Sequence, residues 1–130
     1  MNQVPPHLRY AKTHEWVKLD DDGTATVGIT DYAQSALGDI TFVQLPKVGA
    51  GLAAGAMFGV VESVKAASDV YSPVSGDVVG ANDAIVDQPA LVNESPEDGA
   101  WFFKVKLSNT SELDGLMDRA AYDAFVAGQS

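Results

Sequence analysis

The chain has 130 residues, a length that suits one domain with a single modest core, and we expect residues 1–130 to fold as one unit. Hydrophobic residues make up 46% of the chain and charged residues 20%, which is typical of a globular protein. Eighteen acidic and eight basic residues give a net charge of −10. This charge disfavours nucleic acids and anionic membranes as partners, because both are bound through Lys and Arg. The acidity either serves solubility or steers the protein towards positively charged partners.

The sequence contains no cysteine, which excludes disulfides, thiolate metal sites and a cysteine nucleophile. Any redox sulfur must therefore come from a cofactor. Residues 1–9 contain neither an apolar signal core nor an amphipathic stretch rich in Arg and Ser, so no targeting segment is expected. No apolar run approaches the roughly 20 residues needed to span a bilayer. A start at Met1 favours a bacterial cytoplasmic protein.

Short β-prone segments dominate the first two thirds of the chain. In residues 24–29, apolar side chains alternate with Thr and Gly, which predicts a strand with one buried face. The turn-forming residues 20–23 are expected to join it to the preceding strand as a hairpin. Glycines 49, 51 and 55 indicate a loop. Strands are expected at residues 15–19, 24–29, 40–45, 57–62, 69–72, 77–81 and 103–107.

Helices are predicted to be short. Asp31 is expected to cap one, with Gln34 completing a capping box and Gly38 ending the helix. Pro89 suits the first turn of another that ends near Asn93.

Helical spacing of apolar residues returns in the C-terminal segment, about 111–127. Ser111 with Asp114 is expected to cap it, and Gly115 to weaken or split it. Its apolar residues are Leu113, Leu116, Met117, Ala120, Ala124 and Phe125. These elements together predict a mainly β fold, a sandwich or flattened barrel with short helices and a helical C-terminus.

Catalytic patterns are missing from the sequence. His7 and His14 do not form the His-Glu-x-x-His pair of a zinc site, so no metal ligands are assigned. No Gly-x-Ser-x-Gly elbow accompanies them. We therefore assign no catalytic residue, and the isolated chain is not expected to be an enzyme.

Lys65 is the only basic residue between Lys47 and Lys104, within an acidic stretch. It lies near the tip of a predicted hairpin, about residues 57–74, and its neighbours at 63 and 66–68 are all Ser or Ala. Such a lysine is sterically open to an enzyme that acylates its amine. From spacing alone, an ordinary solvated lysine in a turn is the favoured explanation.

Residues 62–76 (ESVKAASDVYSPVSG) closely resemble the lipoyl-attachment motif of the glycine cleavage system H protein family. Further blocks resemble the same family in the same order, so that the likeness covers roughly residues 8–126; they are 10–17, 27–34, 37–40, 91–94 and 101–107. The resemblance implies a lipoyl/biotinyl-type barrel-sandwich of two small antiparallel sheets, with the modified lysine on a hairpin. Lipoyl domains of 2-oxoacid dehydrogenases usually have Asp-Lys-Ala and biotinyl domains Met-Lys-Met at this point, and Val64-Lys65-Ala66 fits neither.

The resemblance also implies a function. Lys65 is expected to carry lipoic acid as an amide. The carrier would take the aminomethyl group of glycine from a pyridoxal-phosphate glycine decarboxylase to a tetrahydrofolate-dependent aminomethyltransferase. The dithiol would then go to dihydrolipoyl dehydrogenase. Lipoyl-attaching enzymes are further expected partners, and the carrier is expected to be a monomer. The alternative is an H-like protein that relays lipoyl groups to other acceptors.

A carrier of this kind should shelter its loaded arm from water in a cleft. The ammonium group on that arm would favour an acidic neighbour. The resemblance makes Glu15 the first candidate and Asp69 the second. For Glu15 the alternative is a plain carboxylate at a strand edge.

Overall fold

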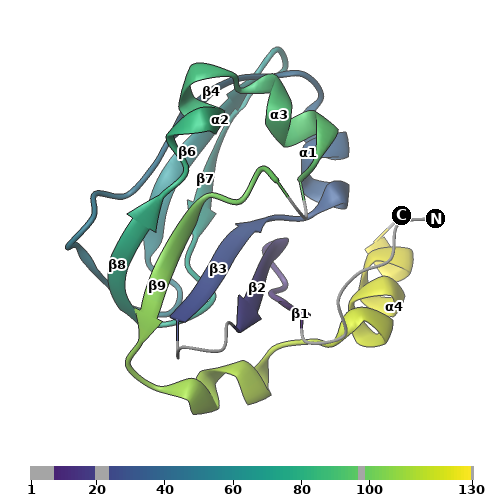
Figure 1. Ribbon diagram of the computed structural model, residues 1–130. Coiled ribbons are helices and arrows are strands. Elements are labelled where there is room, and N and C mark those ends of the chain that lie inside the picture. Colours follow the sequence, from purple (N-terminus) through teal and green to yellow (C-terminus); the bar gives the residue numbers. More distant parts are fainter. Residues whose placement is uncertain (1–7, 20–23, 97–98, 130) are drawn as a thin grey trace.

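The computed structural model describes residues 8–19, 24–96 and 99–129. His7 and the predicted turn at 20–23 lie outside the described residues. A six-stranded antiparallel sheet has the order β1-β2-β3-β9-β8-β5, and a three-stranded antiparallel sheet has the order β4-β6-β7. The predicted lipoyl-type sandwich of two antiparallel sheets is therefore confirmed (Figure 1). The strands are β1 Leu8–Tyr10, β2 Glu15–Leu19, β3 Thr24–Ile29, β4 Ile40–Gln44, β5 Gly51–Leu52, β6 Met57–Ser63, β7 Ala67–Tyr71, β8 Gly76–Ala81 and β9 Phe103–Leu107.

Three of the helices, α1, α2 and α3, gather at one end of the sandwich. Figure 1 shows α1, α2 and α3 close to one another near β4, while α4 lies beside β1. They are α1 Asp31–Leu37, α2 Asp83–Asp87, α3 Ala90–Glu94, the 3₁₀ helix η1 Thr110–Gly115 and α4 Arg119–Gln129. The C-terminal segment thus consists of two helices, with Gly115 as the last residue of the first.

The main core fills the space between the two sheets. β3 and β9 lie side by side, with Val27 opposite Phe103 and Ala25 opposite Val105, and all four side chains are buried. On β9 the predicted alternation is present, because Lys106 is exposed between buried Val105 and half-buried Leu107. Burial of this apolar surface is the main stabilising term of such a sandwich.

A second apolar cluster lies on the other face of the six-stranded sheet, under α4. It consists of Leu8, Tyr10, Trp16 and Tyr122, with Met117, Trp101, Phe125 and Val126 packed against it. The prediction that β3 has only one buried face is therefore wrong. The Trp16 ring covers Gly28 so closely that a β-carbon there would lie 2.7 Å from it. Glycine at this position makes the approach of the indole possible.

Four further details differ from the sequence predictions. Thr30, not Asp31, caps α1, because the Thr30 hydroxyl accepts the Ala33 N–H at 3.2 Å. Asp31 is the first helical residue and instead accepts a hydrogen bond from Gln34. Asn109, not Ser111 with Asp114, caps η1. Part of the predicted glycine loop forms β5, which pairs with β8. Ala120 and Ala124 are exposed, since Tyr122, Phe125 and Val126 form the packed face of α4.

Candidate lysine site and adjoining pocket

Lys65 is exposed at the tip of the hairpin formed by β6 and β7. The Ser63 N–H donates to the Ala66 carbonyl at 2.9 Å and closes the turn. The Ser63 hydroxyl accepts hydrogen bonds from the Lys65 N–H at 3.1 Å and from the Ala66 N–H at 3.2 Å. One small polar side chain thus fixes the shape of the turn and leaves the lysine side chain outside it.

Asp69 lies on β7, between the tip and the far end of the hairpin, and is exposed. Because side chains alternate along a strand, Ala67, Asp69 and Tyr71 project from the same face of β7. Ala67 is exposed as well, and Tyr71 is half-buried. This open face of β7 runs from the turn that bears Lys65 to the end of the strand, over about 13 Å at ~3.3 Å per residue.

Glu15 lies at that far end and is almost completely buried, with 1% of its surface exposed. Its Oε2 accepts the Tyr71 N–H at 3.1 Å, and its Oε1 accepts the Thr13 hydroxyl. Burial raises the pKa of the Glu15 carboxyl from 4.5 to about 7, and the hydrogen bonds from Thr13 and Tyr71 offset part of this effect. The structure therefore brings Glu15 next to the end of β7 and keeps Asp69 on the surface. It does not bring the two carboxylates together.

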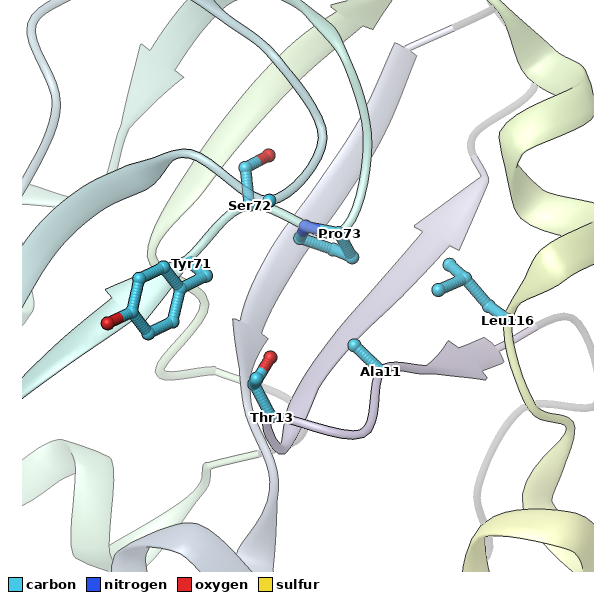
Figure 2. Close-up of a pocket in the computed structure, with 7 residues that line it drawn as sticks. Ala11, Thr13, Tyr71, Ser72, Pro73 and Leu116 are labelled. Atoms are coloured by element: carbon cyan, nitrogen blue, oxygen red, sulfur yellow. The ribbon is translucent and has the colours of Figure 1, made fainter.

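A pocket of about 430 Å³ opens between the β1–β2 turn and the end of β7 (Figure 2). Thr13 and Tyr71, the two residues that donate to the Glu15 carboxylate, are part of its lining. Glu15 itself does not line the pocket and lies behind them. The lining residues are Ala11, Thr13, Gly55, Tyr71, Ser72, Pro73 and Leu116. A mainly apolar pocket with a carboxylate close behind its wall can shelter a small group from water and provide a negative charge.

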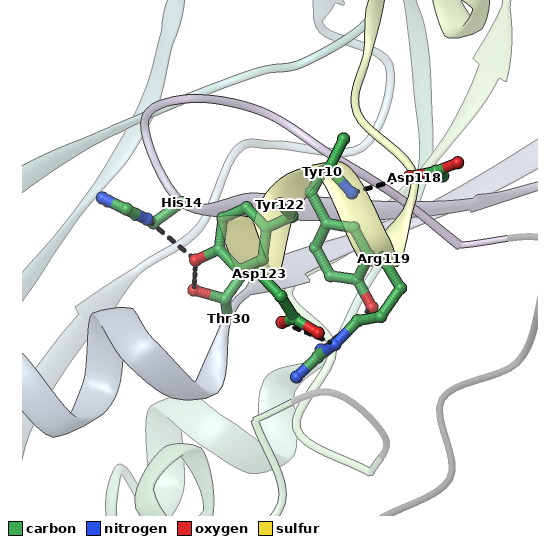
Figure 3. A network of polar contacts seen from close by, with 8 residues as sticks. Tyr10, His14, Thr30, Asp118, Arg119, Tyr122 and Asp123 are labelled. Atoms are coloured by element: carbon green, nitrogen blue, oxygen red, sulfur yellow. Dashed lines mark hydrogen bonds and ion pairs between the residues drawn. The ribbon is translucent and has the colours of Figure 1, made fainter. Parts of the chain in front are cut away.

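His14 makes contacts that no pattern in the sequence indicates. His14 has a φ of 73°, in the left-handed region, and precedes Glu15 in the turn between β1 and β2. Its Nδ1 is hydrogen-bonded to the Tyr122 hydroxyl at 2.8 Å, and that hydroxyl is also bonded to Thr30 Oγ1 at 2.7 Å (Figure 3). The His14 ring also packs against Tyr32 at 4.6 Å between ring centroids. Helix α4 thus anchors the turn that bears Thr13 and leads into Glu15 at the start of β2.

Two negative findings concern only the described residues. Within 8–19, 24–96 and 99–129, no three His, Asp or Glu residues lie close enough together to hold a metal ion. In the same part of the chain, no helix combines the length and the apolar character that crossing a membrane requires.

The fold and the site define a carrier domain of the lipoyl/biotinyl type, a β-sandwich with one exposed lysine at a hairpin tip. The family model described as glycine cleavage H-protein matches residues 8–129, so the chain belongs to the glycine cleavage H-protein family. It is 56% identical over 130 residues to the glycine cleavage system H protein of Teredinibacter turnerae, with 100% of both chains covered. It is 59% identical over 122 residues to that of Opitutus terrae, covering 94% of this chain and 96% of the relative.

A solved structure supports the same assignment. The crystal structure of a glycine cleavage system H protein from Mycobacterium marinum is similar to this fold with a TM-score of 0.85 and 38% sequence identity. The match covers 97% of this chain and 98% of that one.

Proposed function

We propose that this protein is the lipoyl-bearing carrier of a glycine cleavage system and that Lys65 is its attachment point. The observation that carries the proposal is the exposed lysine at the β6–β7 turn, in a chain that matches the H-protein family over residues 8–129. The function is that of a carrier subunit, and its own residues bind, position and shelter.

The surroundings of Lys65 fit an acylated lysine. The side chains next to it are small, and the turn is held by backbone and Ser63 bonds that do not involve the lysine amine. Amide formation therefore removes a charge from an exposed position and breaks none of these bonds. Lipoic acid, when bound there, supplies a disulfide that is opened and re-formed during group transfer.

The pocket beside Glu15 is proposed as the shelter for the carried aminomethyl group. The exposed face of β7 leads from the turn to Tyr71, which lines this pocket and donates to Glu15. A carboxyl with a pKa of about 7 is close to half ionised at neutral pH, and a nearby ammonium group favours the ionised form. Glu15 is therefore suited to attract a cation that enters the pocket, from behind the wall that Thr13 and Tyr71 form. Asp69, exposed on the same face of β7, is proposed to attract the ammonium group as the arm passes from Lys65 to the pocket.

The partners that we propose are a pyridoxal-phosphate glycine decarboxylase, a tetrahydrofolate-dependent aminomethyltransferase and dihydrolipoyl dehydrogenase. Lipoyl-attaching enzymes are proposed to modify the protein before it meets these three enzymes. We propose a monomer in the bacterial cytoplasm, in keeping with the bacterial relatives. The names of those relatives favour glycine cleavage over a role as a lipoyl relay.

The first test is the intact mass of the protein from lipoate-sufficient cells. We expect a lipoyl mass increment that disappears in Lys65→Arg, because arginine keeps the charge and cannot form the amide. Lys12→Arg is the matched control, since Lys12 is exposed on the β1–β2 turn and should leave the increment intact. An unmodified wild-type chain would contradict the proposal.

A second experiment distinguishes glycine cleavage from relay. Glycine–bicarbonate exchange is measured with the decarboxylase and the lipoylated protein. We expect stimulation by the lipoylated wild type and none by Lys65→Arg. Absence of stimulation, combined with lipoyl transfer to another acceptor domain, would favour the relay role.

A further inference from the structure

The side chain of Asn93 joins three segments at the end of the sandwich where the lysine lies. Its Oδ1 accepts the Ile40 N–H at 2.9 Å, and its Nδ2 donates to the Gly38 carbonyl and to Gln34 Oε1, both at 2.9 Å. Helix α3 is thereby bound to the last turn of α1, to the α1–β4 connection and to the start of β4.

The segment that Asn93 holds is in direct contact with the lysine turn. Val64 directly follows β6, and its N–H donates to the carbonyl of Asp39, the residue before β4, at 3.1 Å. Gly38, with a φ of 83°, faces the side chains of the turn. A β-carbon at Gly38 would lie 3.8 Å from Val64 Cγ2 and 3.9 Å from Lys65 Cε, so the lysine stem passes directly over this glycine.

Two kinds of bond therefore act on the turn. The Ser63 bonds join residues within the turn and fix its internal shape. The bond from Val64 to Asp39 and the contact with Gly38 join it to the body of the protein. The direction in which Lys65 projects depends on this second set, and Asn93 keeps the Gly38–Asp39–Ile40 backbone in place for it.

We propose that the connection Gly38–Ile40, held by Asn93, is the platform that orients Lys65 for the lipoyl-attaching enzyme, and that Asn93 is a positioning residue for this modification. The inference rests on the proposed lipoylation of Lys65 and adds a specificity determinant outside the lysine motif. An enzyme that must reach one of six lysines recognises the geometry of a turn, and Asn93 stabilises that geometry from 28 residues away in the sequence.

The affinity of the attaching enzyme depends on the fraction of molecules in which the turn has the orientation that the enzyme binds, here called the competent fraction. If the turn samples several orientations, the apparent affinity of the attaching enzyme falls in proportion to the competent fraction. Loss of Asn93 removes three hydrogen bonds from a half-buried site. We expect the effect to appear as a higher KM with little change in kcat, because the amine of a correctly oriented turn reacts as before.

The test measures lipoylation of purified apoprotein by a lipoate–protein ligase with lipoate and ATP, followed by intact mass. Asn93→Ala is expected to lower kcat/KM about tenfold through KM. The milder Gln34→Ala, which removes one of the three bonds, is expected to lower it about twofold to threefold. The matched control is Asn82→Ala. Asn82 Nδ2 likewise donates to two carbonyls, those of Gly99 and Trp101, away from the turn and its platform.

Amide hydrogen exchange supplies a readout independent of the ligase. In Asn93→Ala the Val64 N–H is expected to exchange faster, while core amides such as that of Val105 keep the protection they have in Asn82→Ala. Equal kcat/KM for Asn93→Ala and Asn82→Ala would overturn the inference, whether both variants match wild type or both lose activity to the same extent. If wild-type protein is not lipoylated at all, the proposed function fails and the inference falls with it.

Discussion

The two ends of the β6–β7 hairpin are stabilised in different ways. At the lysine end, the turn is exposed, its side-chain hydrogen bonds connect residues no more than three apart in sequence, and the backbone bond from Val64 to Asp39 joins it to the body of the protein. At the Glu15 end, the bonds connect distant segments: Tyr71 to Glu15 spans 56 residues, and His14 to Tyr122 spans 108. The first end is open to solvent, whereas at the second Glu15 is buried behind the Tyr71 backbone and the β1–β2 turn, to which Tyr122 of α4 is bonded through His14.

This difference follows from what each end has to do in the proposed function. A lysine that is modified by one enzyme and visited by others must be accessible, so its turn is held by few bonds. A carboxyl that must bind a cation away from water needs burial, which raises its pKa, and burial needs long-range packing. Substitutions at the lysine end should therefore affect modification more than stability, and substitutions at the Glu15 end should affect stability more than modification.

The largest effect on stability is expected for Glu15→Gln and depends on pH. Burial raises the pKa of Glu15 from 4.5 to about 7, so the folded protein binds this proton more tightly than the unfolded chain. The contribution of Glu15 to stability therefore falls as pH rises between these values and stays low above them. Glutamine resembles the protonated form. We expect the stability of the variant, relative to wild type, to increase by about 2–3 kcal/mol between pH 5 and pH 8 in urea denaturation.

Asp69→Asn is the matched control, since it removes a carboxylate that is exposed on β7 rather than buried. Glu15→Gln should also shorten the lifetime of the aminomethyl-loaded protein, measured as release of formaldehyde and ammonia, and leave lipoylation of Lys65 intact. A constant difference in stability across the pH range would show that Glu15 is ionised in the folded protein at pH 5. An unchanged lifetime of the loaded form would remove Glu15 from the proposed mechanism.

Tyr122→Phe is expected to have a smaller effect, about 1–2 kcal/mol of lost stability. The phenylalanine keeps the stack on Tyr10, whose ring centroid lies 4.7 Å away, and loses only the hydroxyl that is bonded to His14 and Thr30. Urea denaturation measures the loss.

Tyr32→Phe provides the control for Tyr122→Phe. The Tyr32 ring packs on His14, but its hydroxyl has no hydrogen-bond partner in the described part of the chain. We expect this control to change stability by less than about 0.5 kcal/mol. If the two variants were equally stable, the hydroxyl of Tyr122 would not be what holds the β1–β2 turn.

What could be predicted from the sequence depends on how local the cause is. The alternation on β9 and the cluster of small residues around Lys65 are local patterns, and they predicted a strand and an exposed lysine correctly. The capping of α1 by Thr30 was missed because Asp31 is an equally good cap by type, and only the observed bond to the Ala33 N–H distinguishes them.

The missed residues share a different cause. Tyr122 and Asn93 act through partners far away in the chain, and no spacing in the sequence identifies a tyrosine that will meet a histidine 108 residues earlier. Glu15 was singled out by family likeness alone. Its burial, which gives it an unusual pKa, arises from the packing of β7 and the β1–β2 turn around it. Long-range side-chain hydrogen bonds and burial are thus the features that local sequence patterns do not predict.

Ser63→Ala is expected to have the smallest effect on stability and the clearest effect on modification. Ser63 is half-exposed, so loss of its hydrogen bonds to the Lys65 and Ala66 N–H groups should cost less than about 1 kcal/mol, because water replaces the lost acceptor. The turn would then sample other shapes, and lipoylation should slow about threefold to fivefold in the ligase assay. Ser68→Ala is the matched control, since its hydroxyl makes only a 3.4 Å bond to the adjacent Asp69 carbonyl. A loss of stability as large as that of Tyr122→Phe, or lipoylation as fast as in Ser68→Ala, would mean that the lysine turn is not held by local bonds, and the contrast between the two ends of the hairpin would disappear.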